Sequence, residues 1–217
     1  MSGASSADTI AAGVIHSFES CRPNNNDQFW PPNAALKHWG RRVNAKSIHY
    51  GRRESLALIT EIIESGVSRE QVVISSFRNG LPSILWGQLF AKVTTIYNQD
   101  SGVPFTTAGK YTIAFGDVTN TRFMYQLIER MGRYSAVILD DLYYAALISP
   151  YYLLKRAMSA KPGVVIFVNT RRAVNGSIAG VQRFLHDLRS GELDGMSHEI
   201  RDITLSDGVG FSYELIL

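Results

Sequence analysis

The sequence predicts an α/β protein with a doubly wound, mostly parallel sheet that ends in an antiparallel hairpin. The first observation is that short apolar or β-branched runs alternate with helical segments, which is typical of parallel strands joined by right-handed crossovers with helices on both faces. Each run is long enough for a strand buried on both faces. The runs are Val72–Ser76, Val93–Tyr97, Thr112–Phe115, Ala136–Leu139 and Val164–Val168.

The second observation is the end of the chain, where the alternation stops. Glu199–Leu205 and Phe211–Leu217 both have strand-like composition, and the turn sequence "SDGVG" joins them. This pattern predicts a hairpin.

Helices are expected where apolar residues recur every three or four positions. The segment from Ser5 to about Ser20 fits a short amphipathic helix, and Gly66 is a suitable stop for a helix ending near Glu64. The remaining helical segments lie between the strands. The expected helices after the first are Glu54–Glu64, Pro82–Ala91, Thr121–Met131, Pro150–Ser159 and Ser177–Ser190.

The N-terminal part differs from the rest of the chain. "CRPNNNDQFWPPNAALKHWGRR" combines Asn and Pro turn chemistry with Phe29, Trp30 and Trp39, which predicts an irregular arm. Its aromatic side chains either pack the arm on the core or contact a substrate. We therefore expect a helical and irregular arm or lid over residues 1–46 and the α/β domain over residues 47–217.

The composition favours a soluble globular protein with one core. Of 217 residues, 45% are hydrophobic and 19% charged, and the net charge of +3 comes from scattered Lys and Arg rather than a basic stripe, which argues against nucleic-acid binding. The single cysteine, Cys21, excludes an internal disulfide and favours a reducing compartment. No stretch is long and apolar enough to span a membrane, so a cytoplasmic location is expected.

The alternation from about Glu54 to Leu217 resembles the class I S-adenosylmethionine-dependent methyltransferases, whose Rossmann-like sheet has a reversed last strand. It is most similar to small-molecule O-methyltransferases and the cephalosporin-hydroxylase-like branch. In "VVISSFRNGLPSILWGQLFAKVTTIY", Ser75 stands at the family's acidic position and Phe77 at its first glycine, and Gly80 remains near the helix start. Asn79 and Gly80 permit a tight turn. The glycine-rich motif is thus degenerate.

Further positions follow from the same resemblance. Asn98 stands near the acid that would bind the ribose hydroxyls, and Asp117 in "AFGDVTN" where the family reads the adenine amino group. The alternative for Asp117 is an N-cap for a helix starting near Thr119. In "VILDDLYYA" Asp140 matches the first acid of the branch's Asp-Gly-Asp-His sequence, but the next positions do not match, so no metal site is predicted.

The resemblance implies S-adenosylmethionine-dependent methyl transfer to a small-molecule acceptor. Candidate bases are His49, Asp140, Asp141 and Tyr143. The alternative is a protein that has lost cofactor binding and acts as a binding or scaffold subunit, or carries a different chemistry in the same pocket.

The pocket is expected outside the carboxyl ends of the strands, between the Val72 and Ala136 strands. Four tyrosines follow this edge and would either line the pocket or pack a helix on the sheet or on a second subunit, as in a homo-oligomer. They are Tyr143, Tyr144, Tyr151 and Tyr152.

Overall fold

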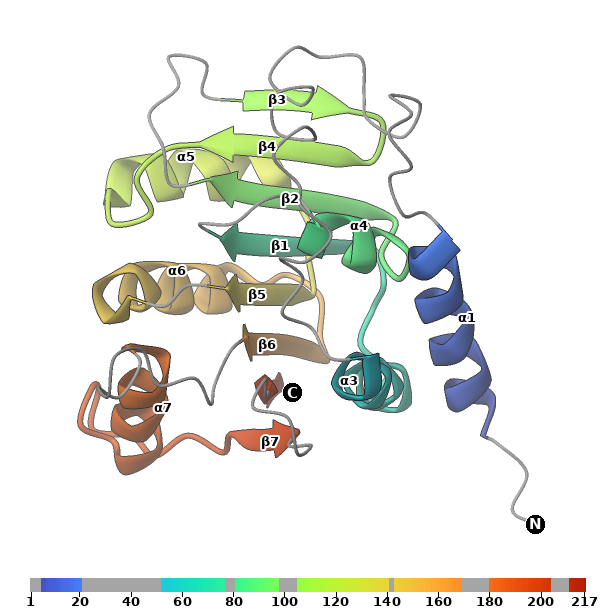
Figure 1. Cartoon of the computed structure of the whole chain (residues 1–217). Helices are drawn as coiled ribbons and strands as arrows, with labels where there is room; N and C mark the ends of the chain where they lie inside the picture. The colour runs from blue at the N-terminus through green and yellow to red at the C-terminus, as the bar shows by residue number, and fades with distance from the viewer. Residues whose placement is uncertain are drawn as a thin grey trace.

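The computed structural model describes residues 5–20, 52–76, 81–97, 105–140, 143–168, 180–203 and 211–217. Within this part of the chain, an eight-stranded sheet has the strand order β3-β4-β2-β1-β5-β6-β8-β7 (Figure 1). The mutually parallel strands are β1 (Gln71–Ser76), β2 (Lys92–Tyr97), β4 (Tyr111–Phe115), β5 (Ala136–Asp140) and β6 (Gly163–Val168). This confirms the predicted doubly wound, mostly parallel sheet.

The reversed C-terminal strands are also confirmed. β8 (Phe211–Ile216) pairs antiparallel with β6 and with β7 (Arg201–Ile203). β7 begins at Arg201 rather than at Glu199, and the expected end at Leu205 lies outside the described residues.

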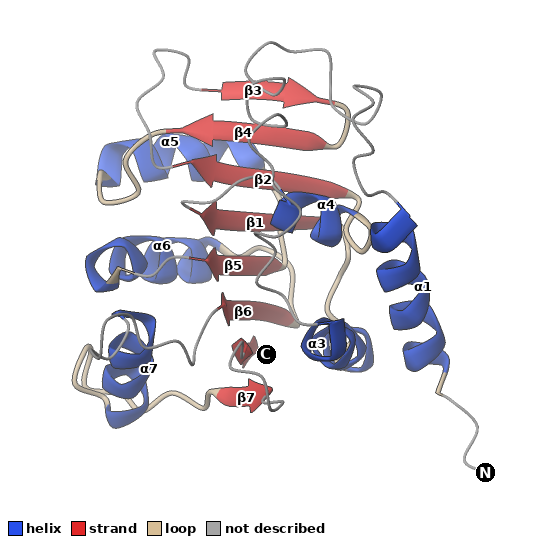
Figure 2. Ribbon diagram, viewed as in Figure 1, coloured by secondary structure: helices blue, strands red, loops and turns tan. Residues whose placement is uncertain are grey.

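Helices cover both faces of the sheet (Figure 2). One face carries α1 (Ser6–Ser20), α3 (Arg52–Glu64) and α4 (Leu81–Gly87). The other carries α5 (Thr121–Met131), α6 (Tyr144–Ala157) and α7 (Gly180–Ser190). In the described residues, no helix is both long and apolar enough to cross a bilayer.

The core is divided by the sheet into two apolar layers, because successive strand residues point to opposite faces. In β1, Val72 and Ile74 join the layer under α1, α3 and α4, whereas Val73 joins the layer under α5, α6 and α7. α1 contributes Ala11, Val14 and Ile15 to the first layer, and all three are buried. The expected boundary between residues 46 and 47 lies outside the described residues.

Two details of the predicted elements were wrong. α6 begins at Tyr144 rather than Pro150, so Pro150 lies inside the helix, although proline cannot donate the usual backbone hydrogen bond there. An additional strand, β3 (Phe105–Ala108), pairs antiparallel with β4 at the edge of the sheet. The turn between them contains Gly109 with φ of 57°, a conformation that glycine adopts without a steric penalty.

Candidate functional site

Four residues are neighbours across the carboxyl ends of the parallel strands. In the register of the sheet, Phe115 of β4 is beside Tyr97 of β2, Tyr97 is beside Ser76 of β1, and Ser76 is beside Asp140 of β5. The alternation of core residues places the side chains of Phe115, Tyr97 and Asp140 on the face of α4. We call these four residues the rim row. The arrowheads of the strands that carry them, β1, β2, β4 and β5, point to the same side in Figure 1.

The rim row crosses the topological switch point of the sheet. From β1 the chain builds outwards through β2 and β4, then returns to the other side of β1 to form β5. Open α/β sheets bind ligands in the crevice at such a point. The expected crevice position, between the Val72 and Ala136 strands, therefore coincides with the Ser76 and Asp140 pair.

The rim row has an acidic end and an aromatic end. Asp140 is buried, with a relative exposure of 3%. At the other end, the rings of Tyr97 and Phe115 meet edge to face, with centroids 6.0 Å apart. A buried carboxylate and an aromatic pair on the same face of the sheet can bind a ligand that carries both a positive charge and a flat ring.

Sequence reasoning identified Asp140 but missed Ser76 and Phe115. Both are the last residues of their strands. The end of each apolar run in the sequence could therefore have indicated a position at the carboxyl edge of the sheet. Ser75, the position matched to the family's acid, is buried on the face of the sheet that α5 and α6 cover, opposite to the side chains of Tyr97 and Asp140.

Asp117 lies in the loop after β4 and is exposed. Its Oδ1 accepts hydrogen bonds from the backbone N–H and the hydroxyl of Thr119, at 2.8 and 2.7 Å. The alternative interpretation of Asp117 as a helix N-cap is wrong, because Asn120 caps α5. Asn120 Oδ1 accepts from the N–H groups of Arg122 and Phe123.

Several predicted site residues lie outside the described residues, and they stay expectations from the sequence. They are His49, Phe77, Asn79, Gly80, Asn98 and Asp141.

The four tyrosines near α6 do not act as one pocket lining. Tyr143 is 67% exposed at the N-cap position of α6. Tyr151 is fully buried and packs on Phe167 and Phe184, so its interpretation as a pocket-lining residue is wrong. Tyr144 and Tyr152 donate hydrogen bonds to carboxylates on and after α7, which fixes α6 against α7.

Those two carboxylates are Asp187 and Asp194. The Tyr144 hydroxyl lies 2.6 Å from Asp187 Oδ2, and this hydrogen bond, with burial, raises the pKa of Tyr144. The Tyr152 hydroxyl lies 3.0 Å from Asp194 Oδ2, and burial together with this contact raises the pKa of Tyr152. Both tyrosines are therefore hydrogen-bond donors at neutral pH.

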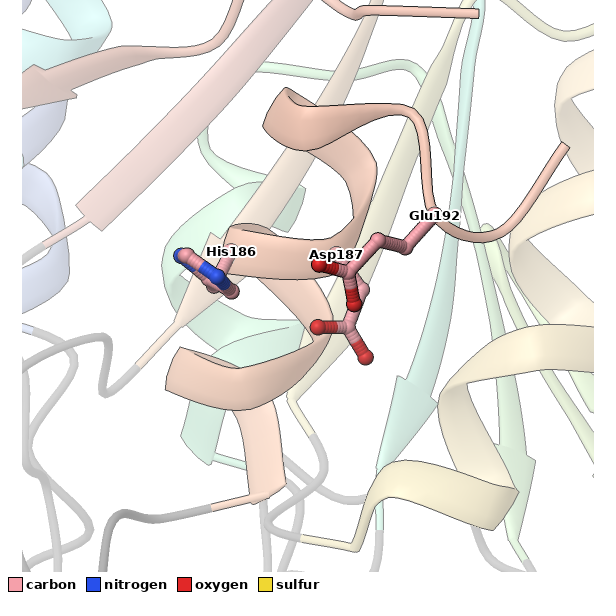
Figure 3. Close-up of side chains that lie close together, drawn as sticks. All are labelled: His186, Asp187 and Glu192. Carbon is pink, nitrogen blue, oxygen red and sulfur yellow. The ribbon is translucent and has the colours of Figure 1, made fainter. Parts of the chain in front are cut away.

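In the part of the chain that the structure describes, one group of metal-ligand type lies near the end of α7 (Figure 3). Ligand atoms of His186, Asp187 and Glu192 lie within 4.8 Å of one another. His186 and Glu192 are exposed, and Asp187 already accepts from Tyr144 and lies 3.9 Å from Arg183. These contacts account for the position of Asp187 without an ion.

Solved methyltransferase structures share this fold. PaMTH1 of Podospora anserina, solved with S-adenosylhomocysteine, is 13% identical, with a TM-score of 0.50 over 98% of this chain and 98% of that one. A Staphylococcus aureus protein assigned as a caffeoyl-CoA O-methyltransferase is 12% identical, with a TM-score of 0.51 over 94% of this chain and 99% of that one.

A third similar structure is MycE, from the mycinamycin biosynthetic pathway, solved with Mg and S-adenosylhomocysteine. It is 14% identical, with a TM-score of 0.50 over 73% of this chain, and this chain spans about half, 48%, of the MycE chain. No family model and no curated protein matches the sequence. At these identities the likeness concerns the fold, and this chain has the fold of the class I S-adenosylmethionine-dependent methyltransferases.

Proposed function

We propose that this protein binds S-adenosylmethionine at the rim row and transfers its methyl group to a small-molecule acceptor. The observation that carries the proposal is the coincidence of the buried Asp140 carboxylate with the switch point of the sheet. The full-length likeness to PaMTH1, a methyltransferase solved with S-adenosylhomocysteine, supports the same ligand class.

The charges of the site residues fit this cofactor. S-adenosylmethionine carries an ammonium and a sulfonium group, and the Asp140 carboxylate supplies a negative charge in a buried position. Both contacts of Asp117 with Thr119 use Oδ1, so its second oxygen can accept a hydrogen bond from the adenine amino group. Tyr97 and Phe115 offer aromatic surface on the same edge of the sheet.

The cofactor supplies an electrophilic methyl group. The protein has to hold the acceptor atom in line with that group and remove a proton from it as the new bond forms. Tyr143 follows the end of β5 and is exposed, so it can contact an acceptor that enters from solvent. His49 and Asp141 are the other candidate bases, and Asp140 is assigned to holding the cofactor.

The competing proposal is a protein that keeps the fold but has lost the cofactor. It is favoured by Ser75, a buried neutral residue where the family has an acid, and by Phe77 at the first glycine position. Such a protein would act as a binding or scaffold subunit or carry a different chemistry.

Calorimetric titration with S-adenosylmethionine and S-adenosylhomocysteine separates the two proposals. We expect saturable binding of both compounds and a loss of roughly tenfold or more in affinity for Asp140→Asn, the usual effect of removing one charged hydrogen-bond partner. Glu199→Gln is the matched control, because Glu199 is an exposed acid that precedes β7 and does not belong to the rim row. Its affinity should equal that of the wild type.

The absence of heat at about 1 mM ligand would overturn the methyltransferase proposal. Phe77→Gly then distinguishes a blocked crevice from an absent one. A gain of binding in this variant would show that the Phe77 side chain occupies the cofactor's position, whereas no gain would favour the scaffold alternative.

A further inference from the structure

A cavity lies at the amino ends of the parallel strands, on the α5 face of the sheet. Its volume is about 410 Å³, within the range of roughly 300–1,000 Å³ that small-molecule sites occupy. β1, β2 and the β3–β4 hairpin form its floor and edge, and the last turns of α5 form its wall. The residues that line it are Gln71, Lys92, Thr94, Phe105, Thr107, Gly109, Lys110, Thr112, Leu127, Arg130 and Met131.

The cavity is strongly basic. Lys92 from β2, Lys110 from the β3–β4 turn and Arg130 from α5 all line it, and none of its lining residues is acidic. Glu70, which precedes β1, has its carboxylate 3.7 Å from Arg133 and does not line the cavity. Lys92 and Arg130 therefore line one space from two elements, and no lining residue carries the opposite charge.

Two of these cations are held by groups that leave their charge in place. The Arg130 guanidinium lies over the Phe105 ring, 4.4 Å from its centroid. The Lys110 ammonium donates one hydrogen bond to the Gly87 carbonyl oxygen and lies 5.5 Å from the centroid of the Tyr111 ring. Gly87 ends α4 on the opposite face of the sheet, so the Lys110 charge is directed away from the cavity. The Arg130 guanidinium has five donors and retains donors for a ligand.

The floor of the cavity is polar, although it is the face of a sheet. Thr94, Thr112 and Thr107 lie side by side across β2, β4 and β3 in the register of the sheet. The Gln71 side-chain amide donates to Thr94 Oγ1 at 3.0 Å, and both residues are buried. Thr94 already accepts this hydrogen bond, so its own hydroxyl hydrogen is available to a ligand oxygen.

The wall is apolar where Phe105, Leu127 and Met131 face the cavity. A ligand that fits these features has an anionic part that meets Lys92, Arg130 and the threonines, and a compact apolar part that meets the wall. A phosphate group suits the first part, because guanidinium and ammonium groups bind phosphate oxygens through charge-assisted hydrogen bonds.

The cavity is separate from the rim row. Lys92 and Tyr97 are the first and last residues of β2, so the two regions are about 17 Å apart at roughly 3.3 Å per strand residue. Ligand binding in the cavity therefore does not depend on methyl transfer at the rim row.

We propose that this cavity is a binding site for a small molecule that carries a phosphate or diphosphate group. Arg130 and Lys92 bind the anion from the wall and the floor, and the threonine row donates hydrogen bonds to it. We name the site by this chemistry, as a phosphate-ester site.

Inorganic pyrophosphate is the probe, titrated into the full chain by calorimetry. We expect one saturable site whose affinity falls as salt is raised. Lys92→Gln and Arg130→Gln should each weaken binding by roughly tenfold or more. Thr112→Val tests the floor without changing the charge, and it should also weaken binding.

Arg122→Gln is the matched control, because Arg122 is an exposed arginine on the same helix that does not line the cavity. Its affinity should equal that of the wild type. Thermal unfolding shows whether each variant is folded. If Arg130→Gln is unfolded because it loses the Phe105 contact, the test is the affinity of Lys92→Gln for pyrophosphate, since Lys92 is exposed and its replacement should not affect folding.

Amide chemical shifts provide the second readout, since pyrophosphate should move the resonances of Thr94, Thr107 and Thr112. The proposal is overturned by no binding at about 10 mM pyrophosphate. It is equally overturned by Arg122→Gln weakening binding as much as Lys92→Gln, which would indicate general attraction to a basic surface.

Discussion

Lys155 and Glu214 form a largely buried ion pair that joins α6 to the reversed strand β8. Lys155 Nζ lies 2.6 Å from Glu214 Oε1, and the same carboxylate accepts a hydrogen bond from the Tyr151 hydroxyl at 2.9 Å. His198 Nδ1 is 3.1 Å from Glu214 Oε1, and His198 Nε2 is 2.9 Å from Asp194 Oδ2. A polar network thus holds the end of the chain against the helical layer.

Replacing Glu214 with Gln should destabilise the protein strongly. The amide keeps the shape of the side chain but leaves Lys155 without its charged partner in a mostly buried position. We expect the free energy of unfolding to fall by about 2–4 kcal/mol. Urea unfolding followed by circular dichroism measures this change.

The control is Glu199→Gln, which removes an exposed ion pair. Arg201 Nη2 lies 3.2 Å from Glu199 Oε1, but the Glu199 side chain is 82% exposed. Its loss should change the free energy of unfolding by about 0.5 kcal/mol or less. Equal effects of the two substitutions would show that the buried network has no special contribution.

Tyr151 should make stability depend on pH in the alkaline range. Burial, the charge of Glu214 and the hydrogen bond to Glu214 raise the pKa of Tyr151 above its ordinary value. The unfolded chain releases this proton near pH 10, whereas the folded chain retains it. The resulting stability is fully present below about pH 10 and is lost as the pH rises through and above that value.

Tyr151→Phe removes this titration. The variant should be less stable than the wild type at neutral pH, and its free energy of unfolding should fall less steeply between about pH 9 and 11. Tyr125→Phe, at a 58% exposed position, is the control and should follow the wild-type curve. Parallel curves for Tyr151→Phe and the wild type would refute the role of Tyr151.

Much of the fold could be predicted because its signals are local. The runs that became β1, β5 and β6 are apolar on both faces, and they specify buried parallel strands without knowledge of their neighbours. β3 has no such run. It is a four-residue edge strand that exists through its pairing with β4, and pairing between strands is not visible in its own residues.

The candidate site could be predicted only in part, for the same reason. Asp140 directly follows an apolar run, so the sequence predicts its place at the carboxyl edge of the sheet. Its position beside Ser76 in the sheet, and the ring contact of Tyr97 with Phe115, depend on the order and register of the strands. The cationic cavity was missed because Lys92 and Arg130 lie far apart in the sequence and meet only in the folded sheet.

Asn120 should stabilise α5 through its capping hydrogen bonds. Asn120 Oδ1 lies 3.0 Å from the N–H nitrogen of Arg122 and 3.2 Å from that of Phe123. Asn120→Ala leaves these groups without a side-chain acceptor and should cost about 1 kcal/mol of unfolding free energy. Asn120→Asp, which retains an acceptor oxygen, should be nearly neutral. A neutral Asn120→Ala variant would contradict the assignment of the cap.

Gly163 and Gly13 should respond to alanine in opposite directions. A Cβ atom at Gly163, the first residue of β6, would overlap Met158 Sδ and lie 3.0 Å from the Ser135 carbonyl oxygen, which belongs to the backbone and cannot easily move. We expect Gly163→Ala to destabilise the protein by about 1–3 kcal/mol. A Cβ at Gly13, within α1, meets open space, so Gly13→Ala should stabilise by about 0.5–1 kcal/mol. Thermal unfolding distinguishes the two, and a stabilising Gly163→Ala would contradict the close packing at the start of β6.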